Sequence, residues 1–338
     1  MLINTAHSVA RKLQRQCAFE IVVLFLVMSN VAIAQQNRCV ERTIPLSVRT
    51  TKSGLDTTLS TSDLQGSYQG KPVQIGGFVS AKTKPRVLYL VEMSEDMERT
   101  GALEDWNFPL DLARALIART PADVHVGIAF FTTTLQHTVR PTADRNKLMA
   151  EIETVRSLRG EALREVGDPP LWDVIRDATD LLAPAQVGDA IYAIVHGGEH
   201  GSKASAQLAT ISLSSEGIRL FAVMRTFQAR EGRYGAFSFQ PTESQKQLMR
   251  IVDDTGGTLI DVPKGSGLSI PRDFSPSSRD LSPVESALDE AFQPLFRVYP
   301  LLIHLPQPVD KLHQLRLDLR NKKDGVHLIY PKTLVPCA

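Results

Sequence analysis

Residues 87–93, VLYLVEM, form an apolar run that carries one acidic side chain, Glu92, close to its end. A second apolar run, residues 190–195 (AIYAIV), leads directly into the glycine-rich segment 196–201, HGGEHG. Continuous apolar runs of this length are typical of strands that are buried on both faces of a parallel sheet. The two segments therefore predict two central strands, each followed by polar residues at its carboxyl end.

Between residues 85 and 263, segments with strand character alternate with segments that repeat apolar residues at helical spacing. This alternation predicts βαβ crossovers and a Rossmann-like α/β domain, in which a doubly wound, mainly parallel sheet is covered by helices on both faces. The further strands are expected at 124–131, 135–139, 218–225 and 258–262, and the helices at 108–118, 145–158, 171–182, 203–214 and 243–253.

The segments on either side of this domain are expected to be β-rich. Residues 35–84 contain alternating stretches with turn signals, and residues 284–338 contain a short helix at 284–292 and strands at 297–305, 312–320 and 326–330. Residues 264–283 are rich in Gly, Ser and Pro and predict a flexible loop. We expect the two flanking segments to form one small β subdomain.

The first 34 residues have the layout of a secretory signal peptide. A basic start is followed by the short apolar run 21–28, and the segment ends in Ala32-Ile33-Ala34, which predicts cleavage after Ala34 and export to a periplasm or out of the cell. The alternative is a retained membrane anchor, but the apolar run is shorter than the ~20 residues that a spanning helix needs. We expect no membrane span after cleavage.

The charge balance excludes one broad class of partners. The 338-residue chain has 38 Lys plus Arg against 37 Asp plus Glu, a net charge of +1, so it lacks the basic surface expected of a nucleic-acid binder. Hydrophobic residues make up 43% of the chain and charged residues 22%, as in ordinary globular proteins.

Two cysteines, Cys39 and Cys337, lie at opposite ends of the expected mature chain. In an oxidising compartment an isolated pair of this kind predicts a disulfide, and the alternative is two unrelated thiols. A metal or catalytic role is disfavoured, because neither cysteine lies in a CxxC or His-rich segment.

The order of these segments resembles that of a known family. Residues 48–54 (VRTTKSG), 59–64 (LSTSDL) and 70–75 (GKPVQI), the strand and loop at 88–97, and the stretch 312–330 are together similar to bacterial proteins related to the von Willebrand factor A (VWA) domain, a group first described in acidobacteria.

The resemblance implies a metal-ion-dependent adhesion site at the carboxyl ends of the parallel strands. In that family the pattern is Asp-x-Ser-x-Ser after the first strand, a Thr in a later loop, and an Asp-Gly-Gly-Asp segment after the fourth strand. Only one ligand position is identical in this chain, so the resemblance implies a degenerate site. The aligned positions are Glu92, Ser94, Asp96, Pro169, His196 and Glu199.

We interpret the chain as an exported, non-enzymatic protein-binding or adhesion-type module that uses no metal or other cofactor. Its partner would be another, unidentified protein, bound at the loop rim that includes Trp172 and His200. One alternative is a metal-dependent adhesion protein in which Glu92, Asp96 and His196 form a rebuilt site, since carboxylates with an imidazole suit Mn²⁺, Zn²⁺ or Fe²⁺. Another is a metal-assisted hydrolase that uses His196 and Glu92, although the sequence contains no nucleophile motif.

Overall fold

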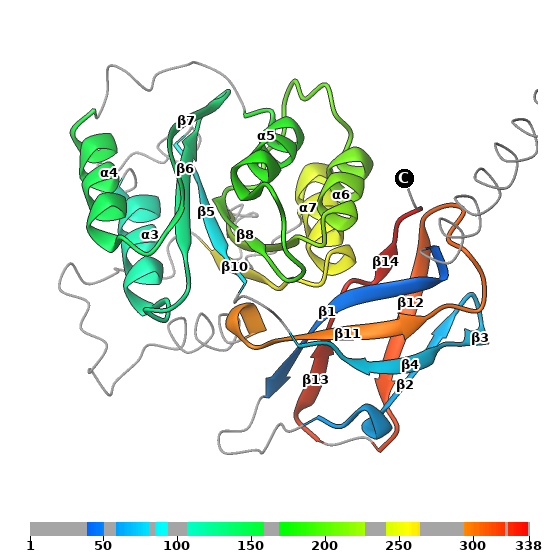
Figure 1. Ribbon diagram of the computed structural model, residues 1–338. Helices are drawn as coiled ribbons and strands as arrows, with labels where there is room; N and C mark the ends of the chain where they lie inside the picture. The colour runs from blue at the N-terminus through cyan, green and yellow to red at the C-terminus, as the bar shows by residue number, and fades with distance from the viewer. Residues whose placement is uncertain are drawn as a thin grey trace, which may run out of the picture.

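A six-stranded sheet forms the centre of the larger part of the chain (Figure 1). The computed structural model describes residues 39–50, 59–80, 85–93, 107–158, 169–226, 241–263, 294–321 and 324–336. All neighbouring strands of this sheet are parallel except the last two, which form an antiparallel hairpin. In spatial order the strands are β10 (Leu259–Pro263), β9 (Arg219–Thr226), β8 (Ala190–Val195), β5 (Val87–Glu92), β6 (Val126–Phe131) and β7 (Leu135–Thr142).

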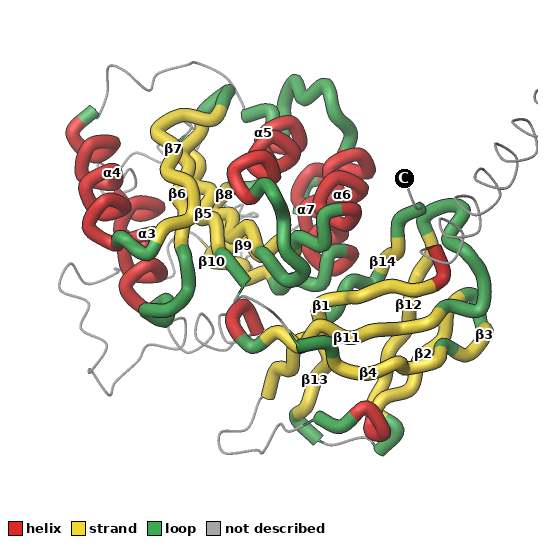
Figure 2. Tube along the Cα trace, viewed as in Figure 1, coloured by secondary structure: helices red, strands yellow, loops and turns green. Residues whose placement is uncertain are grey.

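Helices cover both faces of the sheet (Figure 2). Tyr89 and Val91 of β5 belong to the same buried cluster as side chains of the helices α3 (Asn107–Arg119) and α4 (Arg145–Ser157). Leu88 and Leu90 point to the other face, where they share a cluster with α5 (Leu171–Ala178), α6 (Ala206–Ser215) and α7 (Glu243–Asp254). The prediction of a doubly wound, mainly parallel α/β domain of VWA-like architecture is therefore confirmed.

Strand β5 lies where the winding direction reverses. The chain passes from β5 to β6 on one side, and it later enters β8 on the other side of β5. In open α/β sheets the loops at the carboxyl ends of such neighbouring strands diverge, and ligands bind in the crevice between them. The ends of β5 and β8 are therefore the place to examine for a functional site.

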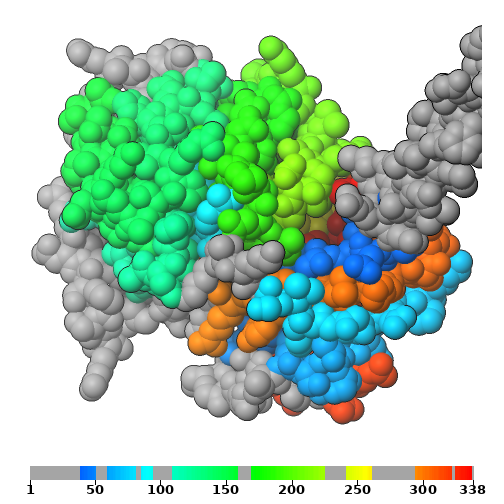
Figure 3. Space-filling view, in the orientation of Figure 1, coloured from blue at the N-terminus to red at the C-terminus, as the bar shows by residue number. Residues whose placement is uncertain are grey.

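Two four-stranded sheets pack into a β sandwich beside the α/β domain. Each sheet combines strands from both ends of the chain. In Figure 3 the blue-to-cyan and orange-to-red residues accordingly lie side by side in this part of the molecule. The α/β domain is thus inserted between the fourth strand of the sandwich and the strands that complete it. The first sheet contains, in spatial order, β13 (Val326–Ile329), β1 (Glu41–Thr50), β11 (Val298–His304) and β4 (Gln74–Phe78). The second contains β14 (Thr333–Leu334), β12 (His313–Leu319), β2 (Leu64–Tyr68) and β3 (Lys71–Pro72).

The sandwich contacts the α/β domain at the amino ends of the parallel strands. Thr333 donates its hydroxyl proton to a carboxylate oxygen of Asp254, at the end of α7, with an oxygen-to-oxygen distance of 2.5 Å. The next turn requires glycine, because Gly256 has a φ of +75° and a Cβ there would lie 2.5 Å from the backbone N of Pro331. Backbone of the two parts is therefore in direct contact.

Several element boundaries differ from the predictions. The helix expected at 171–182 ends at Ala178 and continues as the 3₁₀ helix η2 (Thr179–Leu182). Helix α6 begins at Ala206 and not at residue 203, because Ser205 caps it by accepting a hydrogen bond from the N–H of Leu208. The short strand β14 was not predicted. The expected signal segment, the expected loop at 264–283 and the expected helix at 284–292 lie outside the described residues. Within the described residues no helix has the length and apolar character to cross a membrane.

Candidate functional site

A buried acid–imidazole pair joins the carboxyl ends of β5 and β8. Glu92 is the last residue of β5 and His196 directly follows β8, so the parallel register brings them together. The backbone N–H of His196 donates to Oε2 of Glu92 at 3.0 Å, and His196 Nδ1 is in hydrogen-bond contact with Oε1. Both carboxylate oxygens of Glu92 are therefore hydrogen-bonded to the same residue.

Burial makes this pairing important for the local structure. Glu92 is 0% exposed and His196 is 7% exposed. A carboxylate in such a position is strongly disfavoured unless opposite charge or hydrogen bonds compensate for the lost hydration. The two hydrogen bonds to His196 supply this compensation for Glu92.

The loop that follows His196 is held by α7. Nε2 of Gln245 donates to the backbone oxygen of His196 at 2.9 Å in a buried position. Gly197 has a φ of +79°, and a Cβ there would lie 2.9 Å from both Gln245 Cγ and Met224 Sδ. Only glycine fits this close approach without strain. The backbone at the end of β8 is thus fixed in position, independently of any ligand.

A second set of hydrogen bonds fixes the rest of this loop to the start of α5. The carboxylate of Glu199 accepts from the hydroxyl of Ser202 at 2.7 Å and from the backbone N–H of Trp172 at 3.2 Å. Acidic side chains stabilise a helix at its amino end, where the first N–H groups have no partner within the helix. Glu199 therefore acts as a capping group supplied by a neighbouring loop.

Asp173 makes the reciprocal contact from the first turn of α5. Its two carboxylate oxygens accept from the backbone N–H groups of Lys203 and Ala204 at 2.8 and 2.9 Å. Desolvation alone would raise the pKa of Asp173, but these hydrogen bonds and the charges of Arg176 and Lys203 outweigh it and lower the pKa below its ordinary value. The two loop segments are thus cross-linked in both directions.

Pro169 lies at the same end of the sheet. Its carbonyl oxygen accepts a hydrogen bond from the backbone N–H of His200 at 3.1 Å, while the pair of Glu92 and His196 lies at the start of the same loop. Segments that are far apart in sequence therefore meet around the loop 196–204, which we call the rim loop. Ser94 and Asp96, the other two predicted positions, lie outside the described residues.

The described residues do not fit a metal ion. They contain no group of three or more His, Cys, Asp or Glu side chains arranged to hold one. Pro169 offers only a backbone carbonyl, which already accepts the His200 N–H, and both oxygens of Glu92 are hydrogen-bonded to His196. A divalent cation needs several oxygen ligands directed at one point. We therefore derive no chemistry from a metal at this site.

The structure corrects the prediction for Trp172. Its side chain is only 3% exposed and packs in the core cluster between the sheet and helices α5 to α7, so the indole ring is not available to a partner. The physical reason is its place in the first turn of α5, on the face that packs against the sheet. His200, in contrast, is exposed, and Glu199 is partly buried and is used in capping.

Sequence reasoning missed the residues that hold the rim loop. Gln245, Ser202 and Asp173 act through contacts that no local motif indicates, because they bind backbone groups that lie 29 to 49 residues away. Gln245 is the only one with a recognisable signal, since it also belongs to the Thr242–Gln245 capping box that begins α7. That signal marks a helix start and not a functional site.

Neither a protein-family model nor a curated protein sequence matches this chain. Solved structures with a similar fold include the conserved hypothetical protein BatB from Bacteroides thetaiotaomicron, with 15% identity and a TM-score of 0.43 over 62% of this chain and 98% of that one. The VWA domain of SpRpn10 has 12% identity and a TM-score of 0.40, with 59% of this chain and all of that one covered (100%).

A third similar structure covers more of the chain. The von Willebrand factor type A protein from Catenulispora acidiphila has 12% identity and a TM-score of 0.42 over 89% of this chain and 75% of that one. VWA domains are thus among the structural neighbours of this protein. Because these TM-scores are below 0.5, the assignment of the fold rests on strand order and helix placement, and we infer no function from the neighbours.

Proposed function

We propose that this protein is an exported, non-enzymatic binding module that recognises another protein through the rim loop without a metal ion. Loops carried on a rigid scaffold are the usual place for recognition in such folds. The signal-like segment at residues 1–34 supports export. The adhesion-type character of the module belongs to the same proposal.

The observation that carries the proposal is the pair of hydrogen bonds between Glu92 and His196. In a metal-dependent site the acidic side chain at the end of the first strand would be directed at the ion. Here one oxygen accepts the backbone N–H of His196 and the other is in hydrogen-bond contact with its ring Nδ1, at the junction of β5 and β8. This internal hydrogen-bonded pair supports recognition without a cation.

The exposed part of the rim loop supplies the contact surface. His200 and Lys203 are exposed, and Pro170 is partly exposed beside them. The hydrogen bonds of Glu199 and Asp173 hold this surface in one shape, so little conformational entropy is lost when a partner binds. We therefore expect recognition by shape and by ordinary polar contacts, with one exposed cationic side chain, Lys203.

The arrangement gives little support to a hydrolase. The Ser202 hydroxyl donates to Glu199 and accepts from backbone N–H groups of α5, so it is not presented to a base as a nucleophile would be. His196 makes its Nδ1 contact with buried Glu92, and the described residues of the loop place no nucleophile against it.

A comparison of three immobilised proteins tests the proposal. Wild type, a rim variant with His200→Ala and Lys203→Glu, and a control with Lys147→Glu on α4 would be incubated with solubilised envelope of the source cell. Lys147 is exposed and lies on the opposite face of the sheet, so the control makes the same charge change elsewhere. Any captured protein would then be purified and its affinity for each variant measured by calorimetry.

The proposal requires that the partner bind wild type and the control equally and bind the rim variant at least about tenfold more weakly. EDTA should not change its affinity for wild type. Equal binding to all three proteins would reject the rim loop as the contact surface. Titration with Mg²⁺, Mn²⁺ and Zn²⁺ tests the metal-dependent alternative, which would be supported by micromolar binding that is lost in His196→Ala.

A further inference from the structure

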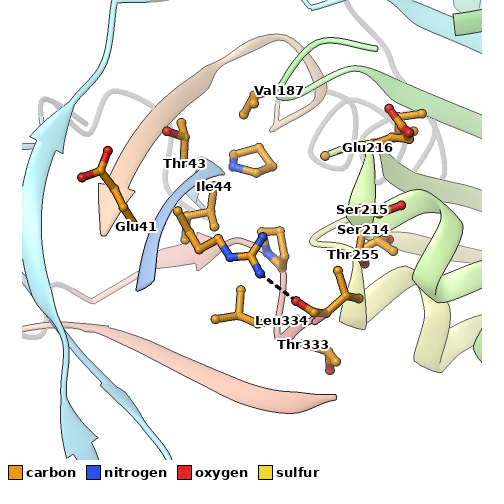
Figure 4. A pocket seen from close by; sticks show the side chains of 16 residues that line it. Glu41, Thr43, Ile44, Val187, Ser214, Ser215, Glu216, Thr255, Thr333 and Leu334 are labelled. Atoms are coloured by element: carbon orange, nitrogen blue, oxygen red, sulfur yellow. Dashed lines mark hydrogen bonds between the residues drawn. The ribbon is translucent and has the colours of Figure 1, made fainter. Parts of the chain in front are cut away.

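A pocket of about 320 Å³ lies at the junction of the two parts of the chain (Figure 4). One wall comes from the start of β1, including Arg42 and Ile44, and from the chain around β14. The other comes from the α/β domain, where Val187, Ile218 and Thr255 belong to the segments that precede β8, β9 and β10. The pocket is therefore at the amino ends of the parallel strands, at the opposite edge of the sheet from the rim loop.

Arg42 places a positive charge in this pocket, and no carboxylate of the described residues pairs with it. A guanidinium has five N–H donors, and the structure shows one hydrogen bond from this group, from Nη2 to the backbone oxygen of Val335 at 3.0 Å. Its Nε is buried and has no hydrogen-bond partner among the described residues. Desolvation lowers the pKa of Arg42, and no carboxylate of the described residues lies within ion-pair distance of it.

A partly desolvated cation of this kind favours a bound anion. Arginine recognises carboxylates by a fork of parallel N–H groups, which gives both energy and orientation. Ser214 and Ser215 add hydroxyl-bearing residues to the pocket wall. The guanidinium would gain from an acceptor that is held in the pocket.

The remaining lining limits the kind of anion. Ile44, Val187 and Leu334 give the pocket apolar walls, and Glu41 and Glu216 lie on opposite sides of it, as Figure 4 shows. Two carboxylates near the pocket disfavour multiply charged ligands such as citrate or phosphate. The volume is at the lower end of the range for small-molecule sites, about 300–1,000 Å³.

We propose that this pocket binds a single carboxylate carried on a small, branched apolar body, with the carboxylate on Arg42 and the body against the apolar walls. The same chemistry could come from a free organic acid or from the C-terminus of a peptide that ends in an apolar residue. Because both parts of the chain line the pocket, a bound ligand would also hold the β sandwich against the α/β domain. This site is independent of the proposed binding at the rim loop.

Titrations of the purified protein with two pairs of probes test the proposal. Isovalerate and its uncharged amide represent the free acid, and the dipeptide alanyl-leucine and its C-terminal amide represent a chain terminus. We expect one or both carboxylates to bind in a 1:1 complex by calorimetry or ligand-observed NMR, and the matching amide to bind at least about tenfold more weakly. The pair that responds identifies the source of the carboxylate.

Two variants locate the binding. Val187→Trp would fill the pocket from a side chain that is 36% exposed, and Val79→Trp would place the same ring at a 43% exposed site on the sandwich as its control. Binding should be lost in the first and kept in the second. Arg42→Gln should also lose binding, and its fold would be checked by circular dichroism because Arg42 holds Val335.

Three results would overturn the proposal. The first is that no carboxylate binds wild type at concentrations up to about 10 mM, which corresponds to a negligible affinity for a specific site. The second is that an amide binds as well as its acid, which would remove the role of Arg42. The third is that Val187→Trp binds as tightly as wild type, which would place the ligand elsewhere.

Discussion

Arg219 donates a hydrogen bond through Nη1 to the hydroxyl of Ser47 at 3.0 Å, although the two residues are 172 positions apart. Arg219 is the first residue of β9 in the α/β domain, and Ser47 lies in β1 of the sandwich. The same guanidinium donates to the backbone oxygens of Gly188, Pro294 and Leu295 at 2.9 to 3.0 Å. One buried side chain thus joins segments from three regions of the chain.

The first prediction concerns this junction. Arg219 is 0% exposed, and burial lowers its pKa while the nearby carboxylate of Asp189 opposes the shift. Arg219→Met keeps most of the side-chain volume but leaves buried oxygens without donors, so we expect it to lower the free energy of unfolding by about 3–5 kcal/mol. Urea denaturation followed by circular dichroism would measure the change.

Arg114→Met is the matched control, because Arg114 lies on α3 with a side chain that is 54% exposed and has one long ion pair of 3.9 Å. It should change the unfolding free energy by no more than about 0.5 kcal/mol. Similar losses in the two variants would show that Arg219 does not stabilise the junction in the way described.

The second prediction concerns acid stability. Because the folded-state pKa of Asp173 is lowered, its contribution is present at pH values above the pKa of an unfolded aspartate and is lost as the pH falls through the folded-state value. Asp173→Asn should therefore destabilise the protein by about 1 kcal/mol at neutral pH, as expected for a lost capping interaction. The difference from wild type should shrink below about pH 4.

Chemical denaturation of both proteins across the acid range would test this. Asp177→Asn is a suitable control, because Asp177 lies on the same helix with a side chain that is 55% exposed. A difference between wild type and Asp173→Asn that stays constant from neutral pH to pH 3 would contradict the proposed role of the ionised carboxylate.

Much of the α/β domain could be predicted because its strands are unusually apolar. Residues of β5 and β8 are buried along their whole length, so their sequence carries no polar alternation and indicates a parallel sheet covered on both faces. Once the two strands were adjacent and parallel, Glu92 and His196 had to meet at one edge. The proximity of these two residues is therefore a consequence of topology that sequence reasoning could reach.

The orientation and burial of individual side chains were harder to predict. The ring of His196 folds back over Gly198, where a Cβ would lie 2.0 Å from Nε2, and no motif specifies this orientation. Trp172 has an amphipathic ring that suits a surface or a core equally well, and only the packing of α5 decides between them. Arg219 would be expected on the surface from its residue type, and the docked sandwich is what buries it.

The third prediction concerns the coupling between Glu92 and His196. Removal of either side chain leaves buried polar groups of the other without a partner, so Glu92→Ala and His196→Ala should each lower the unfolding free energy by about 2–4 kcal/mol. Since the two changes remove the same interaction, the double variant should lose less than the sum, with a coupling of about 1–3 kcal/mol. A double-mutant cycle by urea denaturation measures this coupling.

The comparison pair for this cycle is Glu92→Ala with Thr120→Ala, because Thr120 is buried on the other face of the sheet, where it contacts Tyr89. These two changes should be additive within about 0.5 kcal/mol. Additivity of Glu92→Ala and His196→Ala would mean that the buried pair contributes nothing specific.

The fourth prediction concerns the covalent closure of the sandwich. Cys39 is disulfide-bonded, and its partner lies outside the described residues. The hydrogen bond of Arg42 to Val335 brings the chain near Cys39 together with the chain just before Cys337. A disulfide needs Cα atoms within about 7 Å of each other. We therefore expect Cys39 to be linked to Cys337.

Peptide mapping of the purified protein without reduction should recover the cross-linked pair, and alkylation under native conditions should find no free thiol at either cysteine. Cys337→Ser should lower the unfolding free energy by up to about 5 kcal/mol, because the bond closes a loop that runs from residue 39 to residue 337. Cys17→Ser is the control and should have no effect, since Cys17 lies in the expected signal segment. A peptide that joins Cys39 to Cys17, or to a second chain, would contradict the pairing and with it the closed form of the sandwich.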